Sequence, residues 1–190
     1  AALLPEYRYL VLDEAQHIES IARHTMSTEV SNMRLHVILN QLRKRDGCHL
    51  DALNKALAVN GKFFEALGRA NNSNNYPLPQ NYDIFDLGQE LQRAVKDTVR
   101  MFDVDLVGER ENAIFKCLAR FNQDLGEILD AADPEKVYWV EKSEYRRRKL
   151  ITMHATPLNV SESLDRLLFY NDDLSSAILT SATLSISGDF

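Results

Sequence analysis

Hydrophobic and polar positions follow two different periods along this chain. Residues 9–12 and 177–180 are short apolar runs that each end in a polar cluster. That pattern is typical of buried parallel strands, which deliver polar side chains at their carboxyl ends. Between them, residues 18–132 carry apolar side chains at helical spacing. This region predicts a bundle of four amphipathic helices without strands.

Four apolar stripes define the predicted helices, and their members recur mostly at intervals of three or four residues. Ser31 is suited to cap the first helix. Residues 71–79 have the composition of an exposed loop. The stripes are Leu35, Ile38, Leu39 and Leu42, then Leu50, Leu53, Leu57, Phe64 and Leu67, then Leu87, Leu91, Val95, Val99 and Phe102, then Ile114, Leu118, Phe121, Leu125, Ile128 and Leu129.

Residues 133–157 predict a β-hairpin that leads back from the bundle. Asp133-Pro134 ends the helical pattern, and the strand-like runs 137–140 and 149–153 are joined by a polar turn. After Pro157, a short helix is expected, because Asn159 and Glu162 have the spacing of a helix cap. The predicted fold class is mainly α, with a helical insertion and a small β-hairpin flanked by two parallel strands of an α/β domain.

The spacing of the two terminal runs predicts an inserted domain. A crossover between parallel strands needs only about a dozen residues, whereas residues 17–180, a stretch of 164, separate Gln16 from Ser181. We therefore divide the chain into residues 1–17, 18–132, 133–157 and 158–190. Because two strands alone do not make a stable sheet, we expect the chain to be an internal piece of a longer protein.

Composition narrows the function classes. A net charge of −6 argues against a generally basic nucleic-acid-binding surface but allows a local groove. No apolar run approaches the roughly 20 residues that span a bilayer, and no signal peptide is visible. The absence of such a run predicts that the protein has no membrane partner. Cys48 and Cys117 are isolated in the sequence, which predicts that both are reduced, as in a cytoplasmic protein.

The polar clusters that follow the two terminal strands carry the candidate chemistry. Asp13 and Glu14 are adjacent carboxylates at a strand end, an arrangement that NTP hydrolysis uses for Mg²⁺ and the attacking water. The alternative is an ordinary acidic helix N-terminus. Ser181 and Thr183 place hydroxyls after the second strand. The alternative interpretation of these two residues is a hydroxyl-rich turn after the strand, without a functional role.

Three segments together resemble the DinG-like and XPD-like DNA helicases, the iron–sulfur branch of superfamily 2. They are VLDEAQH at residues 11–17, ATPLNVS at 155–161, and ILTSATL at 178–184 followed by GDF at 188–190. The resemblance implies motif II and motif III of a RecA-like motor domain, separated by a helical Arch domain. It also implies a role in DNA repair and a nucleoid-associated location.

The resemblance assigns roles to individual residues. Asp13 is expected to hold Mg²⁺ through water, and Glu14 to orient or deprotonate the attacking water. Ser181 and Thr183 are expected to contact Gln16 or Glu14 and couple the nucleotide site to DNA movement. Gln16 stands where the family usually has histidine, and it can relay hydrogen bonds but cannot titrate.

Tyr145, Arg146, Arg147, Arg148 and Lys149 form the most basic run in the chain. They are candidates for contact with single-stranded or forked DNA, with phosphates bound by the cations and a base stacked on the tyrosine. The alternative is a solvated hairpin turn.

The predicted function is that of a piece of an ATP-dependent DNA helicase that moves 5′ to 3′ on single-stranded DNA, with ATP and Mg²⁺ required by the parent protein. The sequence contains no GxxxxGK[ST] phosphate loop and no cysteine quartet for an iron–sulfur cluster. The isolated chain is therefore predicted to be inactive. Whether the parent protein carries an iron–sulfur cluster is left open by this sequence. Two alternatives are a non-catalytic DNA- or protein-interaction module and a DinG-like protein fused to an exonuclease.

Overall fold

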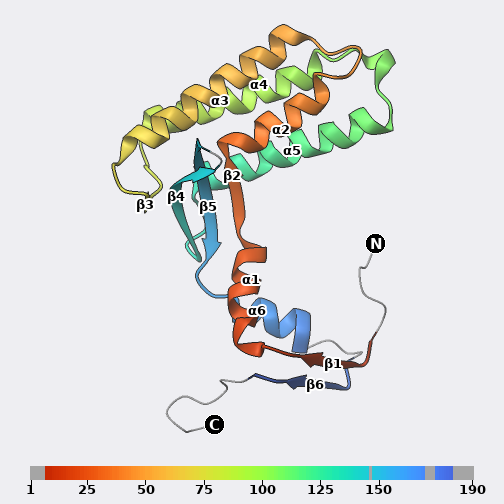
Figure 1. Cartoon of the computed structure of the whole chain (residues 1–190), viewed down its shortest axis with the longest axis vertical. Helices are drawn as coiled ribbons and strands as arrows, with labels where there is room; N and C mark the ends of the chain where they lie inside the picture. Colours follow the sequence, from red (N-terminus) through yellow and green to blue (C-terminus); the bar gives the residue numbers. More distant parts are fainter. Residues whose placement is uncertain (1–6, 146, 170–173, 182–190) are drawn as a thin grey trace. The chain divides into compact units, whose positions relative to one another are not determined.

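The computed structural model describes residues 7–145, 147–169 and 174–181 of the chain. Contacts divide the chain into two compact units (Figure 1). The first consists of residues 1–27 and 156–190, and the second of residues 28–155. Within the described residues, no helix combines the length and apolar content that crossing a membrane requires.

The first unit joins the two ends of the chain through a parallel strand pair. β1 (Tyr9–Leu12) pairs with β6 (Ser176–Leu179), with Leu10 opposite Ala177. The 3₁₀ turn η1 (Ala15–His17) and helix α1 (Ile18–Met26) follow β1. Helix α6 (Ser161–Leu164) and the π-helical turn η3 (Asp165–Phe169) precede β6. The predicted parallel pairing of the two terminal runs is confirmed.

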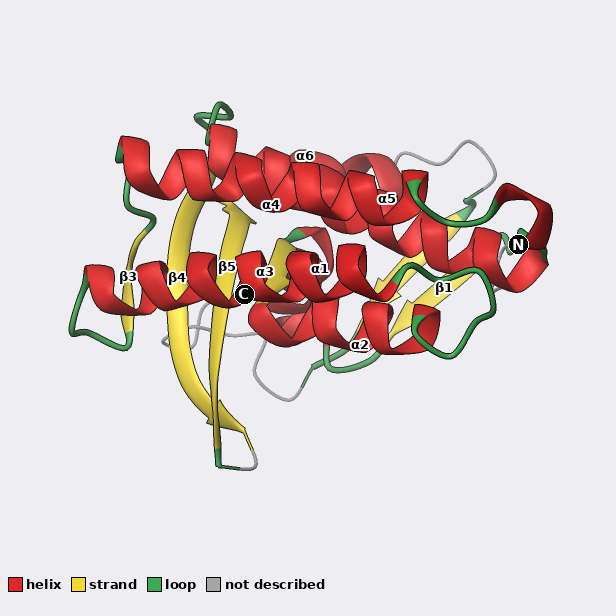
Figure 2. Cartoon of the chain, turned by 90° about the horizontal axis from the view of Figure 1, so that it is seen from above, coloured by secondary structure: helices red, strands yellow, loops and turns green. Residues whose placement is uncertain are grey.

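Four long helices make up most of the second unit, and their axes are roughly aligned in both views (Figures 1 and 2). They are α2 (Asn32–Leu42), α3 (Leu50–Ala70), α4 (Tyr82–Arg100) and α5 (Glu109–Asp130), with the 3₁₀ turn η2 (Val104–Leu106) between the last two. Members of all four predicted stripes supply most of the core, and Phe63, which lies outside them, adds to it. The fully buried residues include Leu35, Leu39, Leu42, Leu53, Phe63, Phe64, Leu67, Leu91, Leu118, Phe121, Leu125 and Ile128.

A four-stranded antiparallel sheet completes the second unit, in the order β2-β5-β4-β3. β4 (Lys136–Tyr145) and β5 (Arg148–Pro157) form the predicted hairpin (Figure 2). β2 (Thr28–Ser31) pairs with β5, and β3 (Asn75–Pro77) pairs with β4. The predicted fold class, mainly helical with a small hairpin and two parallel strands, is confirmed.

The expectation that residues 18–132 contain no strands is wrong. β2 and β3 lie inside that range, and both add to the hairpin rather than to each other. Each is only three or four residues long, too short to show a period of two in the sequence. Each also buries one side chain, Val30 or Tyr76, on the core face of the sheet.

Three finer expectations also need correction. Residues 18–31 are not part of the bundle, because α1 belongs to the first unit and α2 begins only at Asn32. Residues 71–79 are not all exposed, since Tyr76 and Leu78 are buried beside β4. Leu50 is exposed because it is the first residue of α3. The predicted cap is confirmed: the Arg34 backbone N–H donates to Ser31 Oγ at 3.3 Å.

Candidate active site

The backbone ladder of β1 and β6 continues past the strands and holds their polar ends together. The Thr180 N–H donates to the Leu12 carbonyl at 2.8 Å, and the Ala15 N–H donates to the Thr180 carbonyl at 2.9 Å. The carboxyl ends of parallel strands share one edge of a sheet. The structure therefore brings the acidic cluster Asp13-Glu14 beside Thr180-Ser181, although they are far apart in sequence.

Asp13 is held as a carboxylate. Its Oδ1 accepts hydrogen bonds from the Thr180 hydroxyl at 2.5 Å and from the Glu14 backbone N–H at 3.0 Å. The Thr180 bond first, and then the Glu14 bond, lower the pKa of Asp13 below its ordinary value. An exposed, ionised carboxylate of this kind suits Mg²⁺, which is usually held by one or two carboxylates together with waters and phosphate oxygens.

Glu14, Gln16 and Ser181 form a chain of hydrogen bonds. Gln16 Nε2 donates to Glu14 Oε2 at 2.5 Å, and the Ser181 hydroxyl donates to Gln16 Oε1. Gln16 thus uses its amide N–H on the first strand's carboxylate and its carbonyl on the second strand's hydroxyl. A glutamine can make both contacts at once without a proton transfer, because it carries both a donor and an acceptor.

The backbone of Glu14 lies in the left-handed region, with φ 54° and ψ 43°. For a residue with a side chain this conformation costs about 1–2 kcal/mol. Such outliers concentrate at functional sites, where surrounding structure holds them in place. Here the conformation turns the chain sharply from β1 into η1, so that Glu14 and Gln16 share one edge with Ser181.

The strands that carry this site expose apolar side chains. Tyr9 is 74% exposed, Val11 64% and Ile178 54%. Strands in parallel sheets are ordinarily covered on both faces. The described part of the chain therefore presents the acidic cluster on an uncovered strand pair, open to solvent.

Sequence reasoning missed Thr180, the closest partner of Asp13. Its signal was present, since it is the last residue of the apolar run 177–180 and precedes Ser181. Thr183 and Arg146 lie outside the described residues, as do the segment 182–190 and the side chain of Tyr145. In the described residues no group of three or more His, Cys, Asp or Glu side chains is arranged to hold a metal ion.

The basic run belongs to the second unit, at the tip of the β4–β5 hairpin. Arg147 adopts a left-handed conformation with φ 63°, which closes the turn. Arg147, Arg148 and Lys149 are exposed. The described part of the run, residues 147–149, therefore faces solvent.

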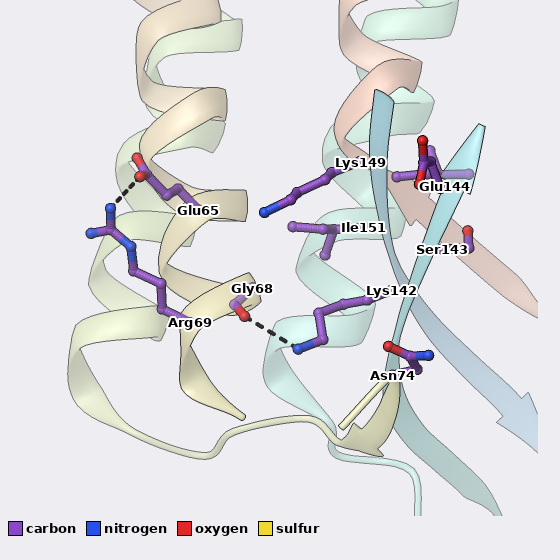
Figure 3. A pocket seen from close by; sticks show the side chains of 10 residues that line it. Glu65, Gly68, Arg69, Asn74, Lys142, Ser143, Glu144, Lys149 and Ile151 are labelled. Carbon is purple, nitrogen blue, oxygen red and sulfur yellow. Dashed lines mark hydrogen bonds and ion pairs between the residues drawn. The ribbon is translucent and has the colours of Figure 1, made fainter. Parts of the chain in front are cut away.

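A cleft of about 600 Å³, lined mostly by polar and charged residues, lies beside this tip, between the C-terminal end of α3 and the hairpin (Figure 3). Lys149 and Ile151 point from β5 toward α3. Lys142 Nζ donates to the carbonyls of Asn71 at 2.5 Å and Gly68 at 3.4 Å, which offsets the negative end of the helix. Arg69 pairs with Glu65 at 2.5 Å. Lys149 also lines the cleft, and its ammonium group has no polar partner among the described residues.

No protein-family model matches the chain, and no curated protein matches it.

Proposed function

We propose that this chain is part of an ATP-dependent DNA helicase similar to the DinG-like and XPD-like enzymes. One observation carries the proposal: β1 and β6 pair in parallel and place Asp13, Glu14 and Gln16 against Thr180 and Ser181. If Asp13 and Glu14 were only the acidic first turn of a helix, contact with hydroxyl groups from the other end of the chain would not be expected. A strand edge that combines ionised carboxylates with hydroxyls suits phosphoryl transfer, which depends on positioning and charge neutralisation.

In this proposal Asp13 and Glu14 have separate roles. Asp13, ionised and oriented by Thr180, would hold Mg²⁺ through water beside the phosphates of ATP. The ion would neutralise charge that develops on the transferred phosphoryl group. Glu14 would orient the attacking water, and the Gln16 amide fixes its carboxylate.

The bond between Gln16 and Ser181 supplies a route from the nucleotide site to the second strand. Loss or gain of ATP phosphates near Glu14 would shift Gln16 and, through it, Ser181. Thr183 is assigned to the same coupling by the family likeness alone. The exposed apolar side chains on the faces of β1 and β6 suit coverage by helices of a larger motor domain that also holds the phosphate-binding elements.

The helical second unit would act as the Arch that helps to enclose single-stranded DNA, and the motor would move 5′ to 3′. Arg147, Arg148 and Lys149 would contact phosphates at the hairpin tip. A cationic tip beside a polar cleft supports this assignment.

Glu14→Gln in the complete motor protein tests the catalytic assignment. The substitution keeps the shape and removes the charge that orients water, so we expect ATP turnover to fall by at least about a hundredfold with nucleotide binding retained. Turnover is measured by phosphate release, and binding by a fluorescent ATP analogue. Glu19→Gln, on the neighbouring helix α1, is the control and should leave turnover unchanged. The 190-residue chain alone should hydrolyse no ATP.

Parental turnover in Glu14→Gln would contradict the proposal. Absence of ATPase activity in the unmodified complete protein would favour a non-catalytic interaction module, and DNA degradation without unwinding would favour the exonuclease fusion.

DNA contact at the hairpin tip is tested with Arg147→Gln/Arg148→Gln. If both cations bind phosphates, single-strand affinity falls, and the salt dependence flattens by about 0.7 per lost contact. Fluorescence anisotropy with a labelled oligothymidylate at two salt concentrations measures both. Lys55→Gln/Lys62→Gln on the exposed side of α3 is the matched control. Unchanged affinity at both salt concentrations would identify the tip as a solvated turn.

A further inference from the structure

We propose that the groove between α4 and α5 is a docking site for an acidic amphipathic helix of another protein. The groove has a volume of about 710 Å³ and lies entirely within the second unit. It is independent of the proposed ATPase site, since no residue of β1 or β6 lines it.

Close packing of α4 against α5 ends where the groove begins. A Cβ built at Gly88 would lie 2.4 Å from Leu129 Cδ1, so α4 and α5 approach closely there and a larger residue would require the Leu129 side chain to move. One turn further along, Gln92 and Asn122 exchange hydrogen bonds with each other's backbone carbonyls, at 2.9 and 3.1 Å. Beyond this pair no hydrogen bond links the two helices among the described residues, and the groove opens toward Arg100.

The floor of the groove is apolar. Val95 and Leu118 form its buried base, and Val99 and Phe115 are only partly buried. The Phe115 ring packs edge-on against Phe102, with centroids 5.3 Å apart. Aliphatic side chains at helical spacing fit such a floor, which is the usual recognition mode of an amphipathic helix in a groove.

The rim determines the charge of the occupant. Lys96, Arg100 and Lys116 line the groove, and all three are exposed. Among the described residues no carboxylate lines it, although the chain carries 28 acidic residues and a net charge of −6. Charges further away than about 8 Å are screened at physiological salt. Asp97 lies 3.9 Å from Arg100 and offsets part of its charge. Lys96 and Lys116 therefore supply most of the positive charge of the rim, which complements an acidic ligand.

These features favour an acidic helix over two other occupants. A second copy of the chain would bring another net charge of −6 to the interface. Single-stranded nucleic acid would need exposed aromatic faces on which to stack bases. Of the described residues, Phe115 is the only aromatic one in the lining, and it is already packed against Phe102.

The probe is a fluorescein-labelled synthetic peptide of about 15 residues, with leucines at i, i+3, i+4 and i+7 and glutamates elsewhere. Anisotropy titration with the 190-residue chain should show saturable binding. A peptide with the same composition in permuted order, and one with lysine in place of glutamate, should each bind at least about tenfold more weakly. Lys96→Glu/Lys116→Glu should weaken binding of the acidic peptide by a similar factor. Lys55→Glu/Lys62→Glu on α3 should leave the affinity unchanged.

Far-ultraviolet circular dichroism of both variants confirms that the fold is kept, since all four lysines are exposed. Absence of saturable binding, equal binding of the permuted peptide, or equal loss in the α3 control would each overturn the proposal. Displacement of the peptide by an oligothymidylate would assign the groove to nucleic acid. A dimer in sedimentation velocity that Lys96→Glu/Lys116→Glu dissociates would assign it to a second copy.

Discussion

At the scale of single residues, Asp124 is the buried charge on which the packing of α2 against α5 depends. Its side chain is 7% exposed and lies between two guanidinium groups, with Arg34 at 2.6 Å and Arg120 at 2.9 Å. The two arginines differ, because Arg34 is 30% exposed and also donates to the Glu29 carbonyl, whereas Arg120 is 69% exposed. Arg34 also lies over the Phe121 ring at 5.9 Å. Arg34 is therefore the principal partner of Asp124.

Replacing each arginine with methionine tests this difference. Arg34→Met leaves a buried carboxylate with one solvent-exposed partner and should lower the free energy of unfolding by about 2–3 kcal/mol. Arg120→Met removes a mostly exposed ion pair and should cost less than about 1 kcal/mol. Urea denaturation followed by the fluorescence of Trp139, the chain's single tryptophan, measures both. Equal losses in the two variants would mean that Asp124 does not depend on Arg34.

At the scale of elements, the N-terminus of α5 depends on a charged cap. Glu111 Oε2 accepts a hydrogen bond from the Gly108 backbone N–H at 3.0 Å, which is one half of a capping box because Gly108 has no side chain to make the other half. The pKa of Glu111 is lowered, chiefly because its carboxylate accepts a hydrogen bond from the Glu111 backbone N–H. Desolvation opposes this shift, whereas the hydrogen bond from Gly108 and the nearby charges of Arg45 and Arg110 add to it. A carboxylate with a lowered folded pKa stabilises the fold above its ordinary pKa of 4.5 and loses that contribution as pH falls.

We expect Glu111→Gln to make the stability of the protein less dependent on pH in the acid range. Glutamine keeps the hydrogen bond to Gly108 but has no proton to take up as pH falls through the folded pKa of Glu111. The measurement is the unfolding midpoint in urea between neutral pH and acid pH below 4.5. Glu109→Gln, in the same first turn, is the control. An unchanged acid slope in Glu111→Gln, relative to the native chain, would contradict the assignment.

Some contacts of the β4–β5 hairpin arise only from pairing with distant strands and cannot be predicted from its sequence pattern. The two strand-like runs predicted β4 and β5, but not the stack of Trp139 on His154, whose ring centroids are 4.1 Å apart. His154 Nδ1 and Nε2 lie 3.4 and 3.3 Å from carboxylates of Glu29 and Glu141. Glu29 comes from β2, which pairs with β5 through contacts more than 120 residues apart in sequence. No local window contains that information.

At the scale of the whole molecule, the second unit contains its own core. Every residue of the principal hydrophobic cluster lies between Val30 and Ala155. The hairpin contributes to this cluster through Val140, Ile151, Met153 and Ala155. The helices and the hairpin are therefore one folding unit, although the sequence suggested separate segments at 18–132 and 133–157.

Excision at the two alternative sets of boundaries tests this unit. Residues 28–155 should fold alone and unfold cooperatively in urea, because the core is complete. Residues 18–132 lack the hairpin and should lose cooperativity, since they expose the apolar side chains that β4 and β5 cover. Circular dichroism follows both excised proteins. Cooperative unfolding of 18–132, or its absence in 28–155, would contradict the structure's division of the chain.

The sequence by itself determined the helices α2 to α5, their buried faces, the hairpin, and the two strand-like runs that end in Asp13-Glu14 and Ser181. These features repeat over several turns or stand beside strong turn signals, so local periodicity is enough to predict them. Only the tertiary structure decided that Thr180 orients Asp13, that β2 and β3 join the hairpin, and that the α4–α5 groove has a cationic rim. Each of these depends on which distant segments meet, and that is settled by the burial of the whole core rather than by any local run of residues.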